Sequence, residues 1–186
     1  MRYLLSFLLF ISGYSFLYPK TIMQIELSGS TEGVIQIELL ENVAPDHVQQ
    51  IIKLVNKKKY DGVAFHRVIE GFMAQTGDVQ FGNSGSDKYD LVRSGTGGSE
   101  LPDLKQEFSN LPHERGTLSM ARSADPNSAN SQFFICFKEA PFLDRQYTVF
   151  GKVIEGMEFV DKIKRGDESQ NGSVENPDKI ISFKSL

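Results

Sequence analysis

The stretch FHRVIEGFMAQTGD, residues 65–78, decides the fold and carries the candidate site. It combines one cation, Arg67, and one amide, Gln75, with large apolar side chains. Because successive side chains of a strand point to opposite faces, the pattern predicts a β-strand with Phe65 and Arg67 on one face. Met73 and Gln75 then share another common face, and the glycine between the two pairs permits a bend or a bulge. Such an apolar surface with a fixed guanidinium can hold an uncharged group and donate a hydrogen bond to it.

A hairpin and a helix precede this stretch. The runs Ile22–Leu27 and Val34–Leu39 have strand patterns, and a turn rich in glycine and serine joins them, which predicts an antiparallel pair. An amphipathic helix is expected from Pro45, because apolar side chains follow at helical spacing and proline is tolerated in a first turn. The run Lys57–Lys59 ends this helix, where positive charge complements the helix dipole.

More strands and a second helix are expected after the opening stretch. Strand patterns occur over Gly116–Ala121, Ser131–Phe137, Tyr147–Ile154 and Lys179–Phe183, and a helix begins near Met157. Many short strands, two helices far apart in the sequence and frequent glycine turns are typical of a mainly β fold, an antiparallel barrel with helices over its ends. Because side chains fill the inside of a small barrel, we expect the site on its outer face.

The strand 131–137 is strongly aromatic. One of its faces carries Gln132, Phe134 and Cys136, and the other carries Phe133, Ile135 and Phe137. Cys136 is the single cysteine of the chain, so it cannot form an intrachain disulfide. Its apolar neighbours predict a buried, unreactive thiol, because a catalytic thiol needs an activating base nearby.

Length and charge limit the function classes. The chain has 186 residues, a length that suits one domain with a sizeable core. Its formal net charge is −4. This acidic balance gives no electrostatic basis for binding nucleic acid or an anionic membrane surface. The long segment Gly82–Gly98 shows little periodicity, and loops of that length inside a domain are usually functional.

The N-terminus has the order of an export signal. Residues 1–17 place one cation, Arg2, before an apolar run and then small residues, as secretory signal peptides do. The run is short for a membrane span, which needs about 20 apolar residues. We therefore expect export, with cleavage after Ser15. An uncleaved N-terminal anchor and a buried first strand are the alternatives.

Other chemistries find little support in the sequence. There is no Gly-x-Ser-x-Gly elbow, so a hydrolase triad would have to assemble from distant segments. Three histidines and one cysteine match no metal-ligand spacing, and the run Gly95–Gly98 lacks the lysine of a phosphate-binding loop. His66 is expected to be a structural residue, hydrogen-bonded beneath the sheet. We expect neither a metal nor a cofactor.

Several motifs lie in one characteristic order from residue 22 to the C-terminus. They are FHRVI and GFMAQTGD (65–78), GTGG (95–98), LSMA (118–121), SQFFI (131–135), FLD (142–144) and VFGKV (149–153). Together they resemble the cyclophilin-type peptidyl-prolyl cis-trans isomerases. The resemblance implies a closed eight-stranded antiparallel barrel capped by two α-helices, formed by residues 21–186.

The same resemblance implies roles for particular residues. Arg67 is similar to the catalytic arginine of the family, and Gln75 to the amide that positions the substrate backbone. The implied substrate contacts are the walls of a proline pocket at Phe72, Met73, Phe134 and Leu143, with a further aromatic wall at Phe142 and an edge at Tyr147. Groove contacts are implied at Ala121 and Gln132, and Gly95 borders the neighbouring pocket.

The implied activity is isomerisation of X-Pro peptide bonds during protein folding. Proline-containing polypeptides would be the partners, the protein would be a monomer, and no cofactor or nucleic acid would be involved. The alternative is a non-catalytic proline-recognising module or holdase chaperone that uses the same groove.

Some residues depart from the family's common pattern. Phe142 stands where many eukaryotic members have tryptophan, so we expect weak cyclosporin binding. Tyr147 replaces a common histidine, Glu70 a common proline, and Arg122-Ser123 the usual Asn-Ala. These departures resemble the bacterial branch. With the N-terminal signal they predict a periplasmic enzyme without stable membrane association after cleavage, rather than a cytoplasmic or anchored one.

Overall fold

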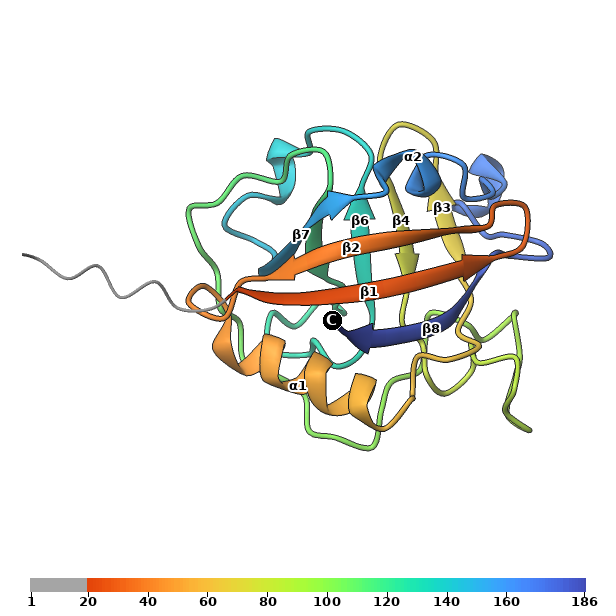
Figure 1. Cartoon of the computed structure of the whole chain (residues 1–186), viewed down its shortest axis with the longest axis horizontal. Helices are drawn as coiled ribbons and strands as arrows, with labels where there is room; N and C mark the ends of the chain where they lie inside the picture. Colours follow the sequence, from red (N-terminus) through yellow and green to blue (C-terminus); the bar gives the residue numbers. More distant parts are fainter. Residues whose placement is uncertain (1–19) are drawn as a thin grey trace, which may run out of the picture.

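A computed structural model describes residues 20–186, and the expected signal peptide at residues 1–17 lies outside the described part. Eight strands form one antiparallel sheet in the order β3-β4-β6-β5-β7-β2-β1-β8 (Figure 1). The strands are β1 Thr21–Ser28, β2 Gly33–Leu39, β3 Arg67–Ile69, β4 Met73–Thr76, β5 Thr117–Met120, β6 Phe133–Cys136, β7 Val149–Glu155 and β8 Lys179–Ser185. The helices are α1 Pro45–Asn56 and α2 Met157–Val160, with short 3-10 turns η1 Pro141–Leu143 and η2 Glu168–Gln170. The predicted mainly β class is therefore confirmed.

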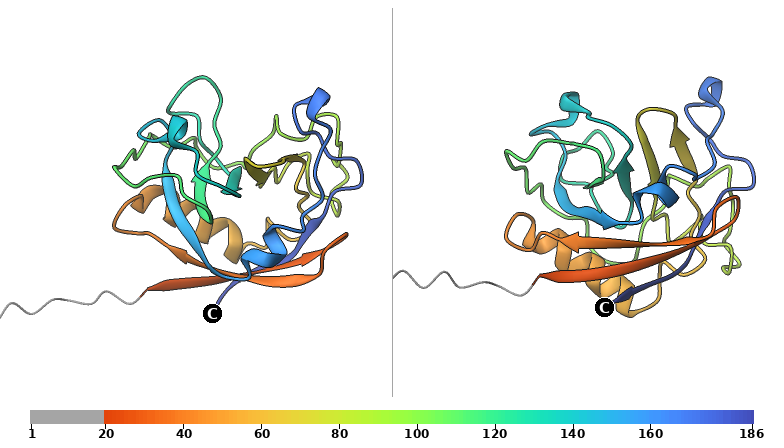
Figure 2. Two further views of the ribbon diagram at one scale, coloured as in Figure 1. Left: turned by 90° about the horizontal axis from the view of Figure 1, so that it is seen from above. Right: turned by 45° about the horizontal axis from the view of Figure 1, so that its top comes forward.

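The sheet curls into a half-barrel, and the expected closed barrel is not confirmed. Seen from above, its strands curl upward on two sides (Figure 2), and apolar side chains fill the inside of the curl. The edge strands β3 and β8 do not pair with each other along their lengths. Between these two edges, the segment before β3 pairs with β8. Ala64 forms an isolated bridge with Lys179, the Gly62 amide donates to the Ile180 carbonyl at 2.7 Å, and the Ile180 amide donates to the Val63 carbonyl at 2.9 Å.

The opening stretch forms a hairpin, so the expectation of one bent strand is wrong. Arg67 lies opposite Gln75 in the β3–β4 register, and Gly71 turns the chain between them with a φ of 69°. The shared face for Phe65 and Arg67 is also wrong. Phe65 precedes β3 and packs in the interior, whereas Arg67 faces outward, because the chain bends from β8 toward β4 between them.

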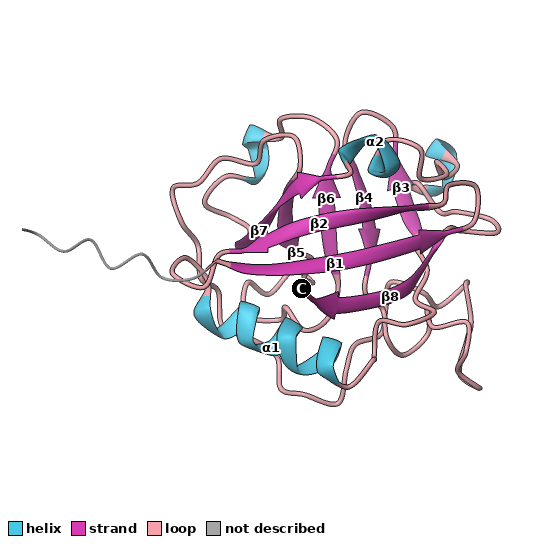
Figure 3. Cartoon of the chain, viewed as in Figure 1, coloured by secondary structure: helices cyan, strands magenta, loops and turns pink. Residues whose placement is uncertain are grey.

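The two helices lie at opposite ends of the curled sheet (Figure 3), and buried residues of both belong to the same interior cluster. The first begins at Pro45 and ends before the lysine run, as its apolar spacing predicted. The second is a single turn, shorter than its pattern suggested. Beyond Val160 the bonds tighten: Ile163 donates to the Val160 carbonyl, three residues back, rather than four. Among residues 20–186, no helix is long and apolar enough to span a bilayer.

The sheet carries one apolar cluster on its inner face and a second, smaller one on its outer face. The interior cluster includes Phe133, Ile135 and Phe137, and the outer cluster includes Phe134 and Cys136. This split confirms the two predicted faces of the aromatic strand. The sheet thus uses one set of alternate residues for the core and leaves the other set to build an outer apolar hollow.

Candidate active site

One row of residues crosses four neighbouring strands on the outer face. Arg67 on β3 lies opposite Gln75 on β4, Gln75 opposite Phe134 on β6, and Phe134 opposite Ser119 on β5. Side chains that are directly opposite in an antiparallel pair lie close together on one face. The register therefore places a guanidinium, an amide and an aromatic ring side by side.

Arg67 is held by three hydrogen bonds. Its Nη1 donates to Gln75 Oε1 at 3.1 Å, its Nε to the Asn171 carbonyl at 3.0 Å, and its Nη2 to Asn171 Oδ1 at 2.9 Å. A guanidinium has five N–H groups. One Nη1 hydrogen and one Nη2 hydrogen therefore remain without a partner among residues 20–186. The guanidinium is fixed in place and still has donors to offer.

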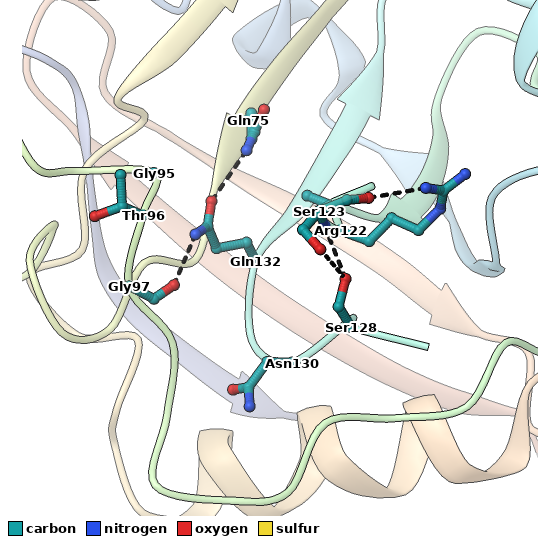
Figure 4. Close-up of a pocket in the computed structure, with 10 residues that line it drawn as sticks. Gln75, Gly95, Thr96, Gly97, Arg122, Ser123, Ser128, Asn130 and Gln132 are labelled. Atoms are coloured by element: carbon teal, nitrogen blue, oxygen red, sulfur yellow. Dashed lines mark hydrogen bonds between the residues drawn. The ribbon is translucent and has the colours of Figure 1, made fainter. Parts of the chain in front are cut away.

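A chain of amides continues from Arg67 across the groove. Gln75 Nε2 donates to Gln132 Oε1 at 3.0 Å, and Gln132 Nε2 donates to the Gly97 carbonyl at 2.8 Å (Figure 4). Asp78 orders the loop that presents this carbonyl, because its Oδ2 accepts from the amides of Gly95 and Gly97 at 2.8 and 2.9 Å. Arg67 near the start of the stretch 65–78 and Asp78 at its end thus both help to orient Gln75 and Gln132.

The charge on Arg67 has no carboxylate partner among residues 20–186. Burial lowers the pKa of this half-buried guanidinium, but arginine remains protonated at neutral pH. Neighbouring His66 adds no second charge there, because burial lowers its pKa to about 4. The prediction that the His66 ring is hydrogen-bonded is wrong: both ring nitrogens are buried without a partner among the described residues.

An apolar hollow lies beside the polar row. Its buried members are Met73, Phe134 and Leu143, and Phe72 packs against them half-buried. The Tyr147 ring meets the Phe134 ring edge-on at 6.1 Å between centroids. Aromatic and aliphatic walls of this kind suit a small apolar ring.

A second hollow of about 240 Å³ adjoins the first, and Figure 4 shows its lining. It brings together Gln75, Gln132, Ala121 and Gly95 from the predicted set. Phe142 lies at the outer edge instead, 62% exposed, with its ring 5.3 Å from that of Phe72. All the predicted site residues therefore gather on one surface, although they come from distant segments.

A Ser-His-Asp arrangement does assemble behind Phe134, but it is closed to substrate. His113 Nε2 lies 3.0 Å from Ser119 Oγ, and His113 Nδ1 lies 2.9 Å from Asp144 Oδ1. Hydrogen bonds from His113 hold the pKa of Asp144 below its usual range. Ser119 is fully buried, and its hydroxyl donates to the Thr148 carbonyl. The group supports the Phe134 ring, on which His113 stacks, and offers no accessible nucleophile.

Other reactive groups are also absent from the groove. Burial and the nearby Asp144 raise the pKa of the Cys136 thiol to about 12, so the thiol is protonated and unreactive at neutral pH. Residues 20–186 contain no cluster of three His, Cys, Asp or Glu side chains that could hold a metal ion. What the groove offers is a fixed hydrogen-bond donor beside an apolar hollow.

Sequence reasoning missed Asn171, which supplies two of the three bonds to Arg67. Asn171 adopts a φ of 57° ahead of a glycine. The Asn-Gly pair does indicate a turn in the sequence. Nothing in the sequence shows that this turn lies against β3, because the contact joins residues more than a hundred positions apart.

Comparisons with known proteins agree with this geometry. The family profile "Cyclophilin type peptidyl-prolyl cis-trans isomerase/CLD" matches residues 22–185. A Brucella suis protein named "Probable peptidyl-prolyl cis-trans isomerase" is 63% identical over 151 residues, which is 81% of this chain and 76% of that protein. The matched segment covers most of both proteins.

Solved structures are also similar. Cyclophilin AquaCyp293 from Hirschia baltica superimposes with a TM-score of 0.69 at 28% identity, covering 87% of this chain and 72% of that one. A Cryptosporidium parvum cyclophilin-type isomerase, crystallised in the presence of the dipeptide Ala-Pro, gives a TM-score of 0.72 at 26% identity over 89% of this chain and 98% of that one.

Proposed function

The chain belongs to the cyclophilin-type peptidyl-prolyl cis-trans isomerases, and we propose that Arg67 drives its isomerisation of X-Pro bonds by donating to the prolyl nitrogen. The observation that carries the proposal is the pair of free guanidinium donors held beside an apolar hollow. The substrate class is proline-containing polypeptide, and the Ala-Pro dipeptide of the Cryptosporidium structure is of that class.

The chemistry of the reaction explains why a donor suffices. Rotation about an X-Pro bond breaks amide resonance against a barrier of ~18–20 kcal/mol. In the twisted state the prolyl nitrogen becomes pyramidal and gains a lone pair that accepts a hydrogen bond. A donor fixed at that nitrogen stabilises the twisted state more than either planar state, and so lowers the barrier. No covalent bond is broken, so no nucleophile is needed.

The rest of the groove positions the peptide. The apolar hollow of Met73, Phe134 and Leu143 holds the proline ring, and excluding water there strengthens the bond from Arg67. Gln75 and Gln132, oriented by their mutual hydrogen bond, meet the peptide backbone. A millionfold acceleration requires only about 8 kcal/mol of differential stabilisation, which such contacts can supply.

A non-catalytic proline-binding module or holdase would need only the apolar hollow. Arg67 favours the enzyme. Its guanidinium is oriented by three hydrogen bonds to neutral groups and has no carboxylate partner among residues 20–186. Holding such a charge half-buried next to an apolar surface costs free energy that the binding of a proline ring does not require.

The test is the rate of cis-trans exchange in a short X-Pro peptide with and without the protein. We expect strong acceleration by the wild type and a loss of at least about a hundredfold in kcat/KM for Arg67→Ala, the size typical of removing one transition-state donor. Binding of the peptide without acceleration by the wild type would instead identify a binding module.

We also propose that the protein is an exported, periplasmic folding factor whose residues 1–17 act as a signal peptide. The charge and hydropathy order of these residues supports the proposal. Fractionation of cells with mass spectrometry of the N-terminus tests it: we expect a periplasmic protein lacking residues 1–15. A cytosolic protein with Met1 intact would overturn it.

Two properties of the purified protein complete the proposal. We expect a monomer by light scattering. We also expect weak cyclosporin binding, because Phe142 lacks the indole N–H that tryptophan would offer at that edge.

A further inference from the structure

A second guanidinium stands at the rim of the groove. Arg122 follows Ala121, whose amide still pairs with the Gln132 carbonyl at 2.9 Å, so the backbone of Arg122 leaves the sheet beside the site. Its stem lines the second hollow, and Figure 4 shows the side chain leading away from Gln132. The guanidinium lies over the Tyr147 ring, with Cζ 4.3 Å from the ring centroid. Since Tyr147 also packs on Phe134, the charge of Arg122 lies next to the apolar hollow.

The guanidinium of Arg122 is held only by neutral groups. Its Nε and Nη2 donate to the Gln146 carbonyl at 3.3 and 3.0 Å, and its Nη1 donates to the carbonyls of Ser123 and Ala124 at 2.8 and 3.4 Å. Four of the five N–H groups are thereby used, and one on Nη2 is left over. Backbone carbonyls fix the orientation of the guanidinium but do not neutralise its charge.

Two other arginines of the protein are neutralised by carboxylates. Arg115 pairs with Asp161 and Arg165 pairs with Glu70, both at 2.6 Å. Arg122 is in none of the ion pairs formed among residues 20–186. An oriented, half-buried and unneutralised cation at the edge of a substrate groove suits an anionic side chain, since a carboxylate would accept a charge-assisted bond from it.

We propose that Arg122 makes this isomerase prefer X-Pro segments that carry a carboxylate side chain, Asp or Glu, within two residues of the proline. An extended peptide advances ~3.3 Å per residue, so a charge beside the apolar hollow can contact only side chains of the peptide residues nearest the proline. This inference rests on the proposed function, because it assigns a substrate preference to the same groove.

The experiment compares peptides that differ by one charge. Glu and Gln are placed in turn at the two positions before and the two positions after proline in a neutral peptide, and kcat/KM is measured for each. At one or more positions we expect the wild type to favour Glu over Gln by about three- to tenfold, as one charge-assisted contact at a partly exposed site allows.

Two variants separate the contact from the general field of the protein. Arg122→Gln should bring the Glu/Gln ratio below about twofold at every position, because the contact is lost. Lys152→Gln removes one positive charge from an exposed site on β7 and should keep the wild-type ratio. For the wild type alone, high salt should reduce the preference through screening, which gives a readout even if the arginine variant folds poorly.

The outcomes distinguish this inference from the function on which it rests. No acceleration of the neutral peptides would overturn the isomerase function itself. Acceleration with a Glu/Gln ratio below about twofold at all four positions, or a ratio that survives Arg122→Gln, would overturn only the role of Arg122.

Discussion

The polar and apolar halves of the groove are built in different ways. Arg67, Gln75 and Gln132 are placed by hydrogen bonds between side chains, and Asn171 completes the set from a distant turn. Met73, Phe134 and Leu143 are placed by packing against one another. Hydrogen bonds fix direction, which a donor to the prolyl nitrogen requires, whereas packing fixes shape, which ring binding requires. Damage to the two halves should therefore affect different kinetic constants.

After the loss of Arg67 itself, the largest expected effect comes from the apolar half. Phe134→Ala should lower kcat/KM by about 30- to 100-fold, mainly through KM, because the contact of an aromatic wall with the proline ring is lost. It should also lower the free energy of unfolding by roughly 3–5 kcal/mol. Peptide kinetics and urea unfolding measure the two effects.

The neighbouring residue on β6 provides the matched control. Phe133→Ala removes an equal ring from the opposite face, inside the core, and should destabilise the protein by a similar ~3–5 kcal/mol. Its kcat/KM per folded molecule should stay near that of the wild type. Equal catalytic losses in the two variants would mean that stability, not the hollow, accounts for the effect.

The next effect concerns the neutral histidine beside the polar half. His66 has a pKa of about 4 in the folded protein, below the ordinary value of 6.5, because burial disfavours its charged form. The unfolded chain therefore binds more protons between these values, and stability falls as pH drops from about 6.5 to about 4. The contribution of His66 over this window is up to about 3 kcal/mol.

Urea unfolding of wild type and His66→Phe at several pH values measures this contribution. We expect the wild type to lose more stability than the variant over that window. Parallel curves for the two proteins would show that His66 does not stay neutral in the fold.

A smaller effect is expected where the polar half is anchored. Asn171→Gly keeps the positive φ and the backbone carbonyl bond to Arg67 Nε but removes the bond from Nη2 to Oδ1. One such bond is worth ~0.5–1.5 kcal/mol, so kcat should fall about three- to tenfold with little change in KM. Asn176→Gly is the control, since Asn176 also has a positive φ but makes no bond to Arg67. A loss that falls on KM alone would mean that Asn171 does not position the guanidinium for the reaction.

The smallest effect is expected at Cys136 in the apolar half. Its thiol is buried, with a pKa of about 12, so alkylation should be negligible in the folded protein at pH 8 and complete in denaturant. Loss of activity on brief treatment with a thiol reagent would contradict a closed, well-packed hollow.

Local features of the fold could be predicted from the sequence, whereas contacts between distant segments could not. Alternation along β6 gave both faces of its aromatic run, and the spacing after Pro45 gave α1, because local periodicity reflects burial directly. The β3–β4 hairpin was predicted as one bent strand, because Gly71 is equally compatible with a bulge and a turn. The family resemblance, rather than periodicity, assembled the distant walls of the hollow.

The remaining errors involve contacts that leave no local pattern. Asn171 reaches Arg67 across the fold, and the His66 ring lies without partners where a hydrogen bond was expected. The Ser119–His113 contact likewise depends on how β5 and the preceding loop pack behind Phe134. Such contacts are set by the tertiary fold and cannot be read from residue spacing.

The central claim is that Arg67 acts on the twisted state of the X-Pro bond rather than on binding. NMR measurements on an X-Pro peptide separate the two. A titration with the enzyme gives the dissociation constant, and exchange measurements at saturation give the rate of cis-trans interconversion on the enzyme. For Arg67→Ala we expect a dissociation constant within about threefold of the wild type and an interconversion rate lowered at least about a hundredfold. An unchanged interconversion rate with weakened binding would contradict the claim.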